Sequence, residues 1–349
     1  MYLVEQHIIT VNDKRYKDLD RICFLSKNLY NVALYTIKQE FLNTGKWIRA
    51  VDLNKKMVAE NNIDYRAMSG SSSQQILMAL DKNLKSYFSA IKAWKRDNKK
   101  FTGCPKFPKY KHKTKGRNVF SYSYAQFKHR GDFIYFPKKE GLSPLRTNCK
   151  EGTVKQVRFV PKSDCYVIEV VYESIVKKQL DDNNRIMSID LGVNNLASIV
   201  TNVSNKPILI DGRRLKSINQ YYNKKRSDIQ QQLKKVNGKE NSRRLMSLTR
   251  RRNNKVKDYL HKASKEIINT CLKEDITTLI VGHNDGWKQN VSLGKRNNQN
   301  FVSIPFEMLI SMLRYKSERH GLRFVEINES HTSKCSSFDL EPICHHDTY

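Results

Sequence analysis

The sequence has no apolar run that approaches the roughly 18 residues needed to span a bilayer. Its first residues, MYLVEQHIITVNDK, alternate like a β-strand and lack the basic start and long apolar core of a secretory signal. The seven cysteines are scattered, odd in number and without a CxxC pair, which disfavours a disulfide framework. We therefore expect a cytoplasmic protein whose cysteines are reduced and mostly buried.

Acidic residues are also in short supply: 34 Asp and Glu stand against 64 Lys and Arg, which leaves a formal net charge of +30. Such a charge repels itself in a compact protein, and the commonest reason to carry it is a partner with a phosphate backbone. Nucleic acid is therefore the leading candidate partner. An anionic membrane surface is a weaker alternative, because neither end of the chain has a strongly amphipathic basic helix.

The first half of the chain combines strand and helix patterns. Residues 2–11 alternate like a strand, and two long segments then repeat apolar residues at spacings of three and four, as amphipathic helices do. They are DLDRICFLSKNLYNVALYTIKQEFLNTG, which ends at Gly45, and SGSSSQQILMALDKNLKSYFSAIKAWKRD, which opens with a serine cluster. From 118 to 173 the pattern changes to short alternating runs. We predict a domain over residues 1–180, an antiparallel β-barrel with a helical insertion at about 18–100.

The second half, residues 181–349, predicts an α/β domain. It begins with RIMSIDLGVNNLASIV, two strand patterns around a turn at Gly192. A helical hairpin is predicted at about 213–273 around VNGKENS. The strand pattern TTLIVG, the helix pattern PFEMLISMLRYKSERHG and the strand pattern LRFVEINES follow.

Two segments concentrate the positive charge. From Lys92 to Arg117 there are eleven basic residues and one acid, with Phe and Tyr between them, and from Asp211 to Lys262 there are seventeen Lys or Arg and four acids. Each could be a solvated connector, but the aromatic interleaving and the charge imbalance favour nucleic-acid contact. The candidate contact residues are Lys106, Lys109, Tyr110, Lys111, Lys113, Lys115, Arg117, Arg213, Arg214, Lys224, Lys225, Arg243, Arg244, Arg250, Arg251 and Arg252.

One carboxylate, Asp190, interrupts the apolar run IMSID two residues before Gly192. In isolation the residue has a simple explanation, because Asp before Gly is a common turn former. Alternatively, an Asp on a central strand beside other strand-borne carboxylates can hold two Mg²⁺ ions, which activate water and steady the leaving oxygen of a phosphodiester. The motif alone does not decide between the two.

Several longer stretches carry a family resemblance, among them SKNLYNVALYTIKQEF, CPKFPKYKHK, SIDLGVNNLASIV, DYLHKAS, IVGHNDGWKQ, NNQNFVSIPFEMLISMLRYKSERHG and NESHTSKCSSFDLE. The chain resembles TnpB proteins, the RNA-guided nucleases of insertion sequences that are related to type V CRISPR effectors. The resemblance implies an oligonucleotide-binding-like barrel followed by a RuvC-like, RNase H-like nuclease domain. It also implies Mg²⁺ and a guide RNA as cofactors, double-stranded target DNA as partner, and a location in the prokaryotic cytosol with the nucleoid.

The resemblance assigns Asp190 to the first RuvC carboxylate and leaves the other two positions altered. Most of the family has a Glu directly after the strand matching TTLIV, where this chain has Gly282 and His283. Some lineages instead carry a Glu in the NES segment, which here is Glu329. In an RNase H sheet these two strands are neighbours, so we expect Glu329 to join Asp190 as a catalytic metal ligand. Glu326 is three residues earlier and is expected to point to the opposite face.

The third family acid belongs to an NAD-like motif, and no such motif occurs before Tyr349. The nuclease domain is therefore predicted to be incomplete at the C-terminus, with two of three metal ligands. A zinc site is not expected either, because the tail lacks the paired CxxC motifs of the family's zinc ribbon. The residues that could bind zinc in principle are Cys335, Cys344, His345 and His346.

These observations favour an RNA-guided DNA-binding protein of a transposon with a RuvC-like endonuclease site that is incomplete in this chain. A nuclease-dead, guide-directed DNA binder that acts like a repressor is the first alternative. A basic RNA-binding structural protein is the second. The sequence leaves the oligomeric state open.

Overall fold

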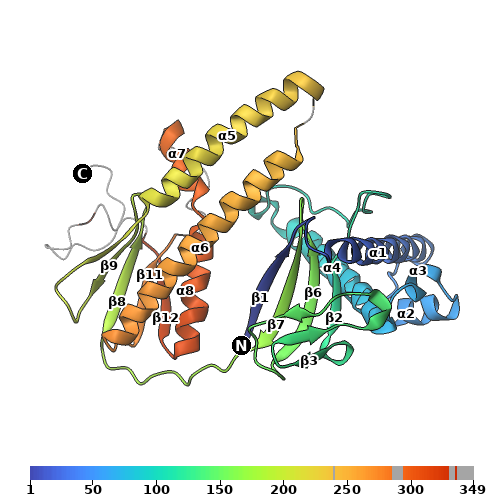
Figure 1. Ribbon diagram of the computed structural model, residues 1–349, viewed down its shortest axis with the longest axis horizontal. Helices are drawn as coiled ribbons and strands as arrows, with labels where there is room; N and C mark the ends of the chain where they lie inside the picture. Colours follow the sequence, from blue (N-terminus) through green and yellow to red (C-terminus); the bar gives the residue numbers. More distant parts are fainter. Residues whose placement is uncertain (239, 285–293, 330–334, 336–349) are drawn as a thin grey trace. The chain divides into compact units, whose positions relative to one another are not determined.

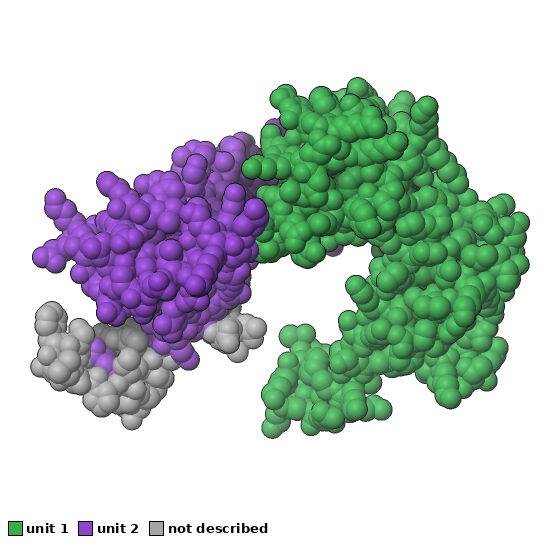
Figure 2. Space-filling view, turned by 90° about the horizontal axis from the view of Figure 1, so that it is seen from below, with its two compact units in different colours: residues 1–174 green, residues 175–349 purple. Residues whose placement is uncertain are grey.

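The computed structural model describes residues 1–238, 240–284, 294–329 and 335. The chain divides into two compact units, Met1–Ser174 and Ile175–Tyr349 (Figure 2). Each unit has its own cluster of buried apolar side chains. We describe the units separately.

The first unit contains a four-stranded antiparallel sheet with the strand order β1-β7-β6-β2 (Figure 1). The register places Tyr2 opposite Glu173 and Ile9 opposite Tyr166, so the first strand of the unit pairs along its whole length with the last. The strands are β1 (Tyr2–Ile9), β2 (Phe120–Ser123), β6 (Val154–Pro161) and β7 (Tyr166–Glu173).

Helices lie between β1 and β2 in the chain, as the 3.6-residue pattern predicts. The two long ones are joined by two short ones, and one 3₁₀ turn follows. On α1 the apolar stripe that includes Leu19, Ile22 and Leu29 is fully buried. Gly45 ends α1 with φ of 68°, and its N–H donates to the carbonyl of Phe41. The helices are α1 (Tyr16–Thr44), α2 (Ala50–Ala59), α3 (Ile63–Arg66) and α4 (Gly70–Arg96), with the turn η1 (Asn98–Lys100).

The predicted closed barrel is not found among the described residues of this unit. Strands β3 (Lys128–Arg130), β4 (Phe133–Tyr135) and β5 (Leu145–Arg146) instead form a second, three-stranded antiparallel sheet. The reason lies in the interruptions between the short alternating runs. A capping box that links Ser123 to Gln126 ends β2 and starts the turn η2 (Tyr124–Gln126), and η3 (Lys138–Glu140) separates β4 from β5.

The second unit contains a five-stranded sheet with the order β10-β9-β8-β11-β12. Strand β9 is antiparallel to both of its neighbours, β8 and β10, and β11 and β12 run parallel to β8. The unit is mixed α/β, in agreement with the sequence, although the short edge strand β10 was not predicted. The strands are β8 (Ile186–Leu191), β9 (Asn195–Thr201), β10 (Ile208–Asp211), β11 (Thr278–Gly282) and β12 (Arg323–Ile327).

Two helices cover one face of this sheet. Met187, Ile189 and Leu191 of β8 are buried in a cluster with side chains of α6 (Arg243–Lys273) and α8 (Phe306–His320). Figure 1 shows α6 continuing past the sheet beside α5 (Arg213–Asn237), with which it forms the hairpin; α7 (Lys295–Ser303) precedes α8. Because side chains alternate along a strand, Asp190 lies on the face that is turned away from α6 and α8. None of the described helices is long and apolar enough to cross a membrane.

Candidate metal centre and nucleic-acid surfaces

Asp190 projects from the central strand of the five-stranded sheet. It is the fifth residue of β8 and pairs with Ser198 of β9, while its neighbours Ile189 and Leu191 are buried. The Asp190 side chain is exposed. A central strand therefore holds one carboxylate rigidly on a face that solutes can reach.

Glu329 reaches the same face from two residues beyond the end of β12, the edge strand that β11 separates from β8. In the parallel register, Val281 of β11 pairs with Ile189 of β8, and Gly282 pairs with Ile327 of β12. The next residues after the first pair, Gly282 and Asp190, therefore lie side by side. The side chain of Glu329 passes directly over Gly282: a Cβ built on that glycine would overlap the Oε1, Cδ and Cγ atoms of Glu329. The Glu329 carboxylate thus lies where a residue-282 side chain would otherwise begin.

Hydrogen bonds fix the chain on both sides of this contact. The N–H of His283 donates to the carbonyl of Ile327 at 2.9 Å, which extends the β11–β12 ladder by one step. The N–H of Glu329 donates to Oδ1 of Asn284 at 2.7 Å. The segments that carry Gly282 and Glu329 are therefore tied to each other directly.

The electrostatics show that the two carboxylates are close enough to interact. The pKa of Glu329 is raised, first because burial removes water from the carboxylate and second because Asp190 adds a like charge; His283 opposes the shift. A carboxylate that is partly buried beside a like charge is stabilised in its ionised form by a hard cation. Such oxygen donors fit Mg²⁺ rather than a soft metal.

Glu326 does not belong to this site. It is level with Val281, whose side chain is buried, and it forms an ion pair with Arg314 of α8. The helix-covered face therefore takes Glu326, and the open face takes Glu329, as strand alternation predicts. His283, the residue after Gly282, contacts a different acid: its Nε2 lies 2.7 Å from Oε1 of Glu307.

The described residues contain no group of three or more His, Cys, Asp or Glu side chains that could hold a metal ion. Asp339 and Asp347, two acids of the tail that come too early in the sequence to match the family's third acid, lie outside the described residues. Of the four residues considered for zinc, Cys344, His345 and His346 also lie outside them.

The basic loop of the first unit is anchored on α1. Arg117 makes a two-bond ion pair with Asp20, at 2.7 Å and 2.8 Å, and Asn31 exchanges two hydrogen bonds of 2.9 Å with the backbone of Lys111. The Arg117 guanidinium lowers the pKa of Asp20, and burial lowers the pKa of Lys111. Arg117 and Lys111 are thus engaged within the protein. Asp20 and Asn31, which the sequence did not single out, hold the loop in place.

The remaining candidates in this loop are exposed. Their cationic groups are free to meet phosphates, and Tyr110, 46% exposed, lies under the ammonium of Lys38 at 4.3 Å from the ring centre. The exposed candidates are Lys106, Lys109, Tyr110, Lys113 and Lys115.

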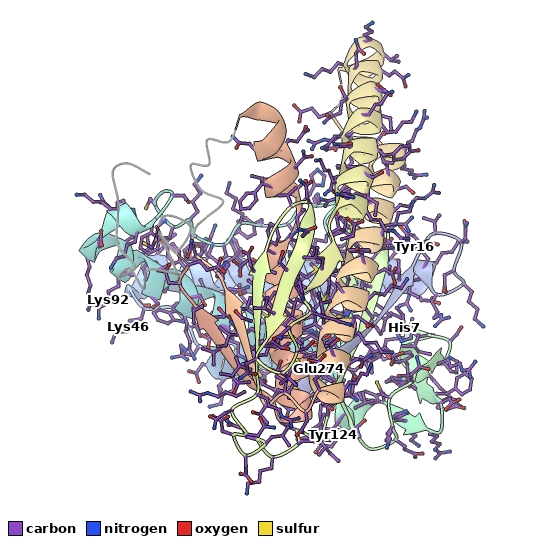
Figure 3. The ribbon with its side chains drawn as sticks, turned by 90° about the vertical axis from the view of Figure 1, so that its left-hand side faces the viewer. His7, Tyr16, Lys46, Lys92, Tyr124 and Glu274 are labelled. Atoms are coloured by element: carbon purple, nitrogen blue, oxygen red, sulfur yellow. The ribbon has the colours of Figure 1, made fainter. Side chains whose placement is uncertain are left out.

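The candidate residues of the hairpin formed by α5 and α6 also divide into half-buried and exposed ones. Arg252 is half-buried and donates to the side chain of Asn219 and to the carbonyl of Ser303, at 2.7 Å and 2.6 Å, so it joins α6 to α5 and to the end of α7. Arg250 is also half-buried, whereas the other candidates are exposed, and Figure 3 shows nitrogen-tipped side chains along both helices. The exposed candidates are Arg213, Arg214, Lys224, Lys225, Arg243, Arg244 and Arg251.

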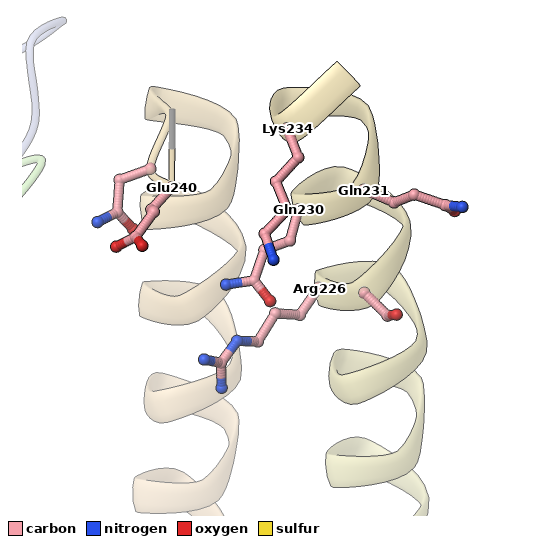
Figure 4. A pocket seen from close by; sticks show the side chains of 7 residues that line it. Arg226, Gln230, Gln231, Lys234 and Glu240 are labelled. Carbon is pink, nitrogen blue, oxygen red and sulfur yellow. The ribbon is translucent and has the colours of Figure 1, made fainter. Parts of the chain in front are cut away.

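A polar groove of about 690 Å³ lies where the hairpin turns (Figure 4). Arg226, Gln230 and Lys234 line it from successive turns of α5, opposite Glu240 and Asn241. Amide and cationic donors outnumber the acid, so the groove suits a phosphate-bearing ligand better than an apolar one.

Known proteins resemble this chain in the region of Asp190 and Gly282 and beyond it. The OrfB_IS605 family model, described as a probable transposase, matches residues 169–288, which include Asp190 and Gly282. A TnpB-like protein of Methanocaldococcus jannaschii is 32% identical over 209 residues, which cover 56% of this chain and 68% of that protein. The chain belongs to the TnpB-like family. A TnpB-like protein of Acidianus two-tailed virus is 22% identical over 366 residues, covering 95% of this chain and 78% of the viral protein.

The fold of this TnpB-like protein also has a solved counterpart. Its structure is similar to that of Cas12f1 in a complex with a guide RNA and target DNA, with a TM-score of 0.53, 12% identity, and coverage of 91% of this chain and 73% of the other. At that identity the likeness concerns the fold. It extends over both units of the TnpB-like chain.

Proposed function

We propose that this TnpB-like protein binds a guide RNA and directs to double-stranded DNA a RuvC-like, Mg²⁺-dependent endonuclease site, of which Asp190 and Glu329 are two of the three expected acids. In this proposal residues 181–349 are the nuclease domain, and residues 1–180 are the nucleic-acid-binding domain with its helical insert. The observation that carries the proposal is the position of Glu329 over Gly282, on the face that carries Asp190.

The two acids are held in position in different ways. Asp190 is held by paired strands on both sides, and Glu329 is oriented by Asn284 and by the space over Gly282. Bound Mg²⁺ would activate a water molecule and stabilise the charge that develops at the scissile phosphate. A glutamate that a neighbouring strand supplies therefore substitutes for the family Glu at position 282.

The cationic surfaces supply affinity without sequence information. Phosphate contacts by Lys and Arg release counterions and position a nucleic acid, whereas pairing with the guide reads the target sequence. The exposed Lys and Arg of the basic loop and of the hairpin suit this role. The similarity of the fold to a protein solved with guide RNA and target DNA supports the same partners.

The test combines binding and cleavage. The chain is purified with its co-expressed RNA and mixed with a matched duplex and Mg²⁺. We expect cleavage that Asp190→Ala and Glu329→Ala abolish and that Glu326→Ala, the matched control on the other face, leaves intact. Guided binding without cleavage would instead support the nuclease-dead alternative, and RNA binding without guided DNA capture would overturn the proposal.

A double variant sharpens this test. Gly282→Glu combined with Glu329→Ala returns the acid to the position where most of the family has it. We expect partial recovery of cleavage compared with Glu329→Ala alone, because the side chain added at position 282 would start from the space that the Glu329 carboxylate fills. Recovery requires a shared metal site, and a merely structural role of Glu329 would give none.

A further inference from the structure

The three-stranded sheet of the first unit has one buried and one exposed face. On the buried face, Ile134 and Leu145 are 0% and 2% exposed. On the other, Phe133 and Tyr135 of β4 are 41% and 43% exposed. A strand that alternates in this way has two large aromatic rings on its solvent side, where a folded protein gains nothing from them unless a partner covers them.

Cations flank both rings. The register places Arg130 of β3 and Arg146 of β5 on either side of Phe133, and Lys128 beside Tyr135. Directly opposite residues in an antiparallel pair share a face, so three cationic and two aromatic side chains lie on one surface. We call these five residues, Lys128, Arg130, Phe133, Tyr135 and Arg146, the aromatic platform.

We propose that the aromatic platform binds unpaired bases of single-stranded RNA. Bases stack on exposed aromatic rings whatever their sequence, and adjacent cations neutralise the backbone phosphates. An apolar protein partner fits less well, because three cations would have to lose their water around the rings.

The distance between the two rings favours a nucleic-acid strand whose neighbouring bases are not stacked on each other. The ring centres of Phe133 and Tyr135 are 6.5 Å apart and the ring planes are 49° from parallel. This distance is about twice the ~3.4 Å rise per base of a duplex strand, so the two rings can each take one base only when the strand is extended. A duplex, whose bases are already stacked, offers no comparable surface.

One carboxylate at the edge favours RNA over DNA. Asp132 follows the turn at Gly131; its side chain is 67% exposed, and Oδ2 lies 3.6 Å from a guanidinium nitrogen of Arg146. A carboxylate repels phosphate but accepts a hydrogen bond from a ribose 2′-hydroxyl, which DNA lacks. The platform lies outside the metal site, and the proposal holds whether or not the protein cuts DNA.

The experiment uses the full chain in EDTA, so that no cleavage interferes. Single-stranded RNA dodecamers that carry one 5-iodouridine are photocrosslinked, and the crosslinked peptide is mapped by mass spectrometry. We expect crosslinks at Phe133 or Tyr135. Other basic surfaces also bind RNA, so the crosslinked position is the primary readout.

Variants separate stacking from charge. Phe133→Leu with Tyr135→Leu should lower affinity for the dodecamer roughly 10-fold or more and leave its salt dependence unchanged. Arg130→Gln with Arg146→Gln should instead flatten the plot of log affinity against log salt by about 1.4. Tyr124→Leu removes a tyrosine that is 71% exposed and outside the platform, so it is the matched control and should change neither quantity.

Three results would contradict the proposal. The first is a crosslink map that omits β4 in the wild-type protein. The second is equal affinity of the double leucine variant and the Tyr124→Leu control, with both melting like the wild type. The third is an equal loss of affinity for a DNA dodecamer, which would overturn the choice of RNA.

Discussion

The side chain of Glu329 covers Gly282, and the two residues are complementary: any side chain at 282 would occupy the space that the Glu329 carboxylate fills. A glycine at position 282 is therefore required for the Glu329 carboxylate to lie where it does. It is more than the absence of the glutamate that most of the family has there. Gly282 comes at the end of a strand, without a positive φ, so the backbone itself does not demand glycine. Glycine is required because the Glu329 carboxylate occupies the space above residue 282.

We predict that Gly282→Ala removes metal binding without unfolding the protein. The added methyl group would meet the end of a flexible side chain, so Glu329 can swing away at little cost in stability while the acid pair is broken. Mg²⁺-dependent cleavage should fall at least as far as in Glu329→Ala. The melting temperature of the second unit, Ile175–Tyr349, in EDTA should stay within about 2 °C of the wild type, which corresponds to less than ~1 kcal/mol in a unit of this size.

The control for this substitution is Gly103→Ala. A methyl group added at Gly103 would have nothing within 4 Å, and the residue has no positive φ, so the same change there should alter neither metal binding nor melting. Full metal-dependent activity of Gly282→Ala would show that Glu329 does not act from above the glycine.

We predict that Asp190→Asn stabilises the metal-free protein near neutral pH. Burial and the Asp190 charge hold the folded-state pKa of Glu329 above its ordinary value of 4.5. A raised carboxyl pKa contributes stability that is fully present below 4.5 and lost as pH rises through the folded value, and removing Asp190 reduces that loss. Melting in EDTA at about pH 5 and about pH 8 should show a small gain for the variant at the higher pH alone.

We expect Mg²⁺ to reverse the order of stability of the wild type and Asp190→Asn. Saturating Mg²⁺ should raise the melting temperature of the wild type and leave Asp190→Asn nearly unchanged, because a ligand stabilises only the state that binds it. A variant that is less stable than the wild type in EDTA at both pH values would contradict the repulsion between the two acids.

We predict different outcomes for two adjacent arginines of α6. Arg251 is exposed, so Arg251→Ala should weaken nucleic-acid binding evenly across sequences and reduce the salt slope by about 1, with melting unchanged. Arg252 bonds to Asn219 and to the carbonyl of Ser303, so Arg252→Ala should lower the free energy of unfolding by about 1–3 kcal/mol. Salt titrations and urea melts on the two variants measure both effects. Equal loss of stability in both would contradict the assignment.

We predict that Lys316 makes the second unit more stable as pH rises from about 8 to 10.5. Burial, and secondarily Lys265, lowers the pKa of Lys316 to about 8, while its ammonium donates to the carbonyl of His261 and to Ser264 Oγ at 3.0 Å and 2.7 Å. In this window the unfolded chain binds more protons than the folded one, so stability increases with pH. The melting difference between wild type and Lys316→Met should change across the window, and parallel pH curves would contradict the lowered pKa.

The sequence predicted the elements that have a strong period or a clear end. The stripe of α1 and its end at Gly45, and the order of β8, β9, β11, α8 and β12, follow from local patterns. The closed barrel was not found among the described residues, because hydrogen bonds such as those between Ser123 and Gln126 break the strands where the alternation continues. The strand β10 was missed because four residues carry too little pattern.

The candidate site shows the same limit. Asp190 could be singled out because a charge in an apolar run is conspicuous, and Glu329 because of the family resemblance. The overlap of Glu329 with Gly282 depends on the register of β11 and β12, which one sequence does not contain. Likewise, the charge count could not separate the exposed Arg251 from Arg252, whose contacts come from distant parts of the chain.

The most direct test of the account is whether Asp190 and Glu329 bind one metal ion together. Mn²⁺, which takes the oxygen ligands of Mg²⁺, is titrated into the full chain and followed by electron paramagnetic resonance. We expect Asp190→Asn and Glu329→Gln each to weaken binding at least 10-fold, the double variant to add little more, and Glu326→Gln to bind like the wild type. Additive losses in the double variant, or Mn²⁺ binding that withstands Glu329→Gln, would contradict the shared site.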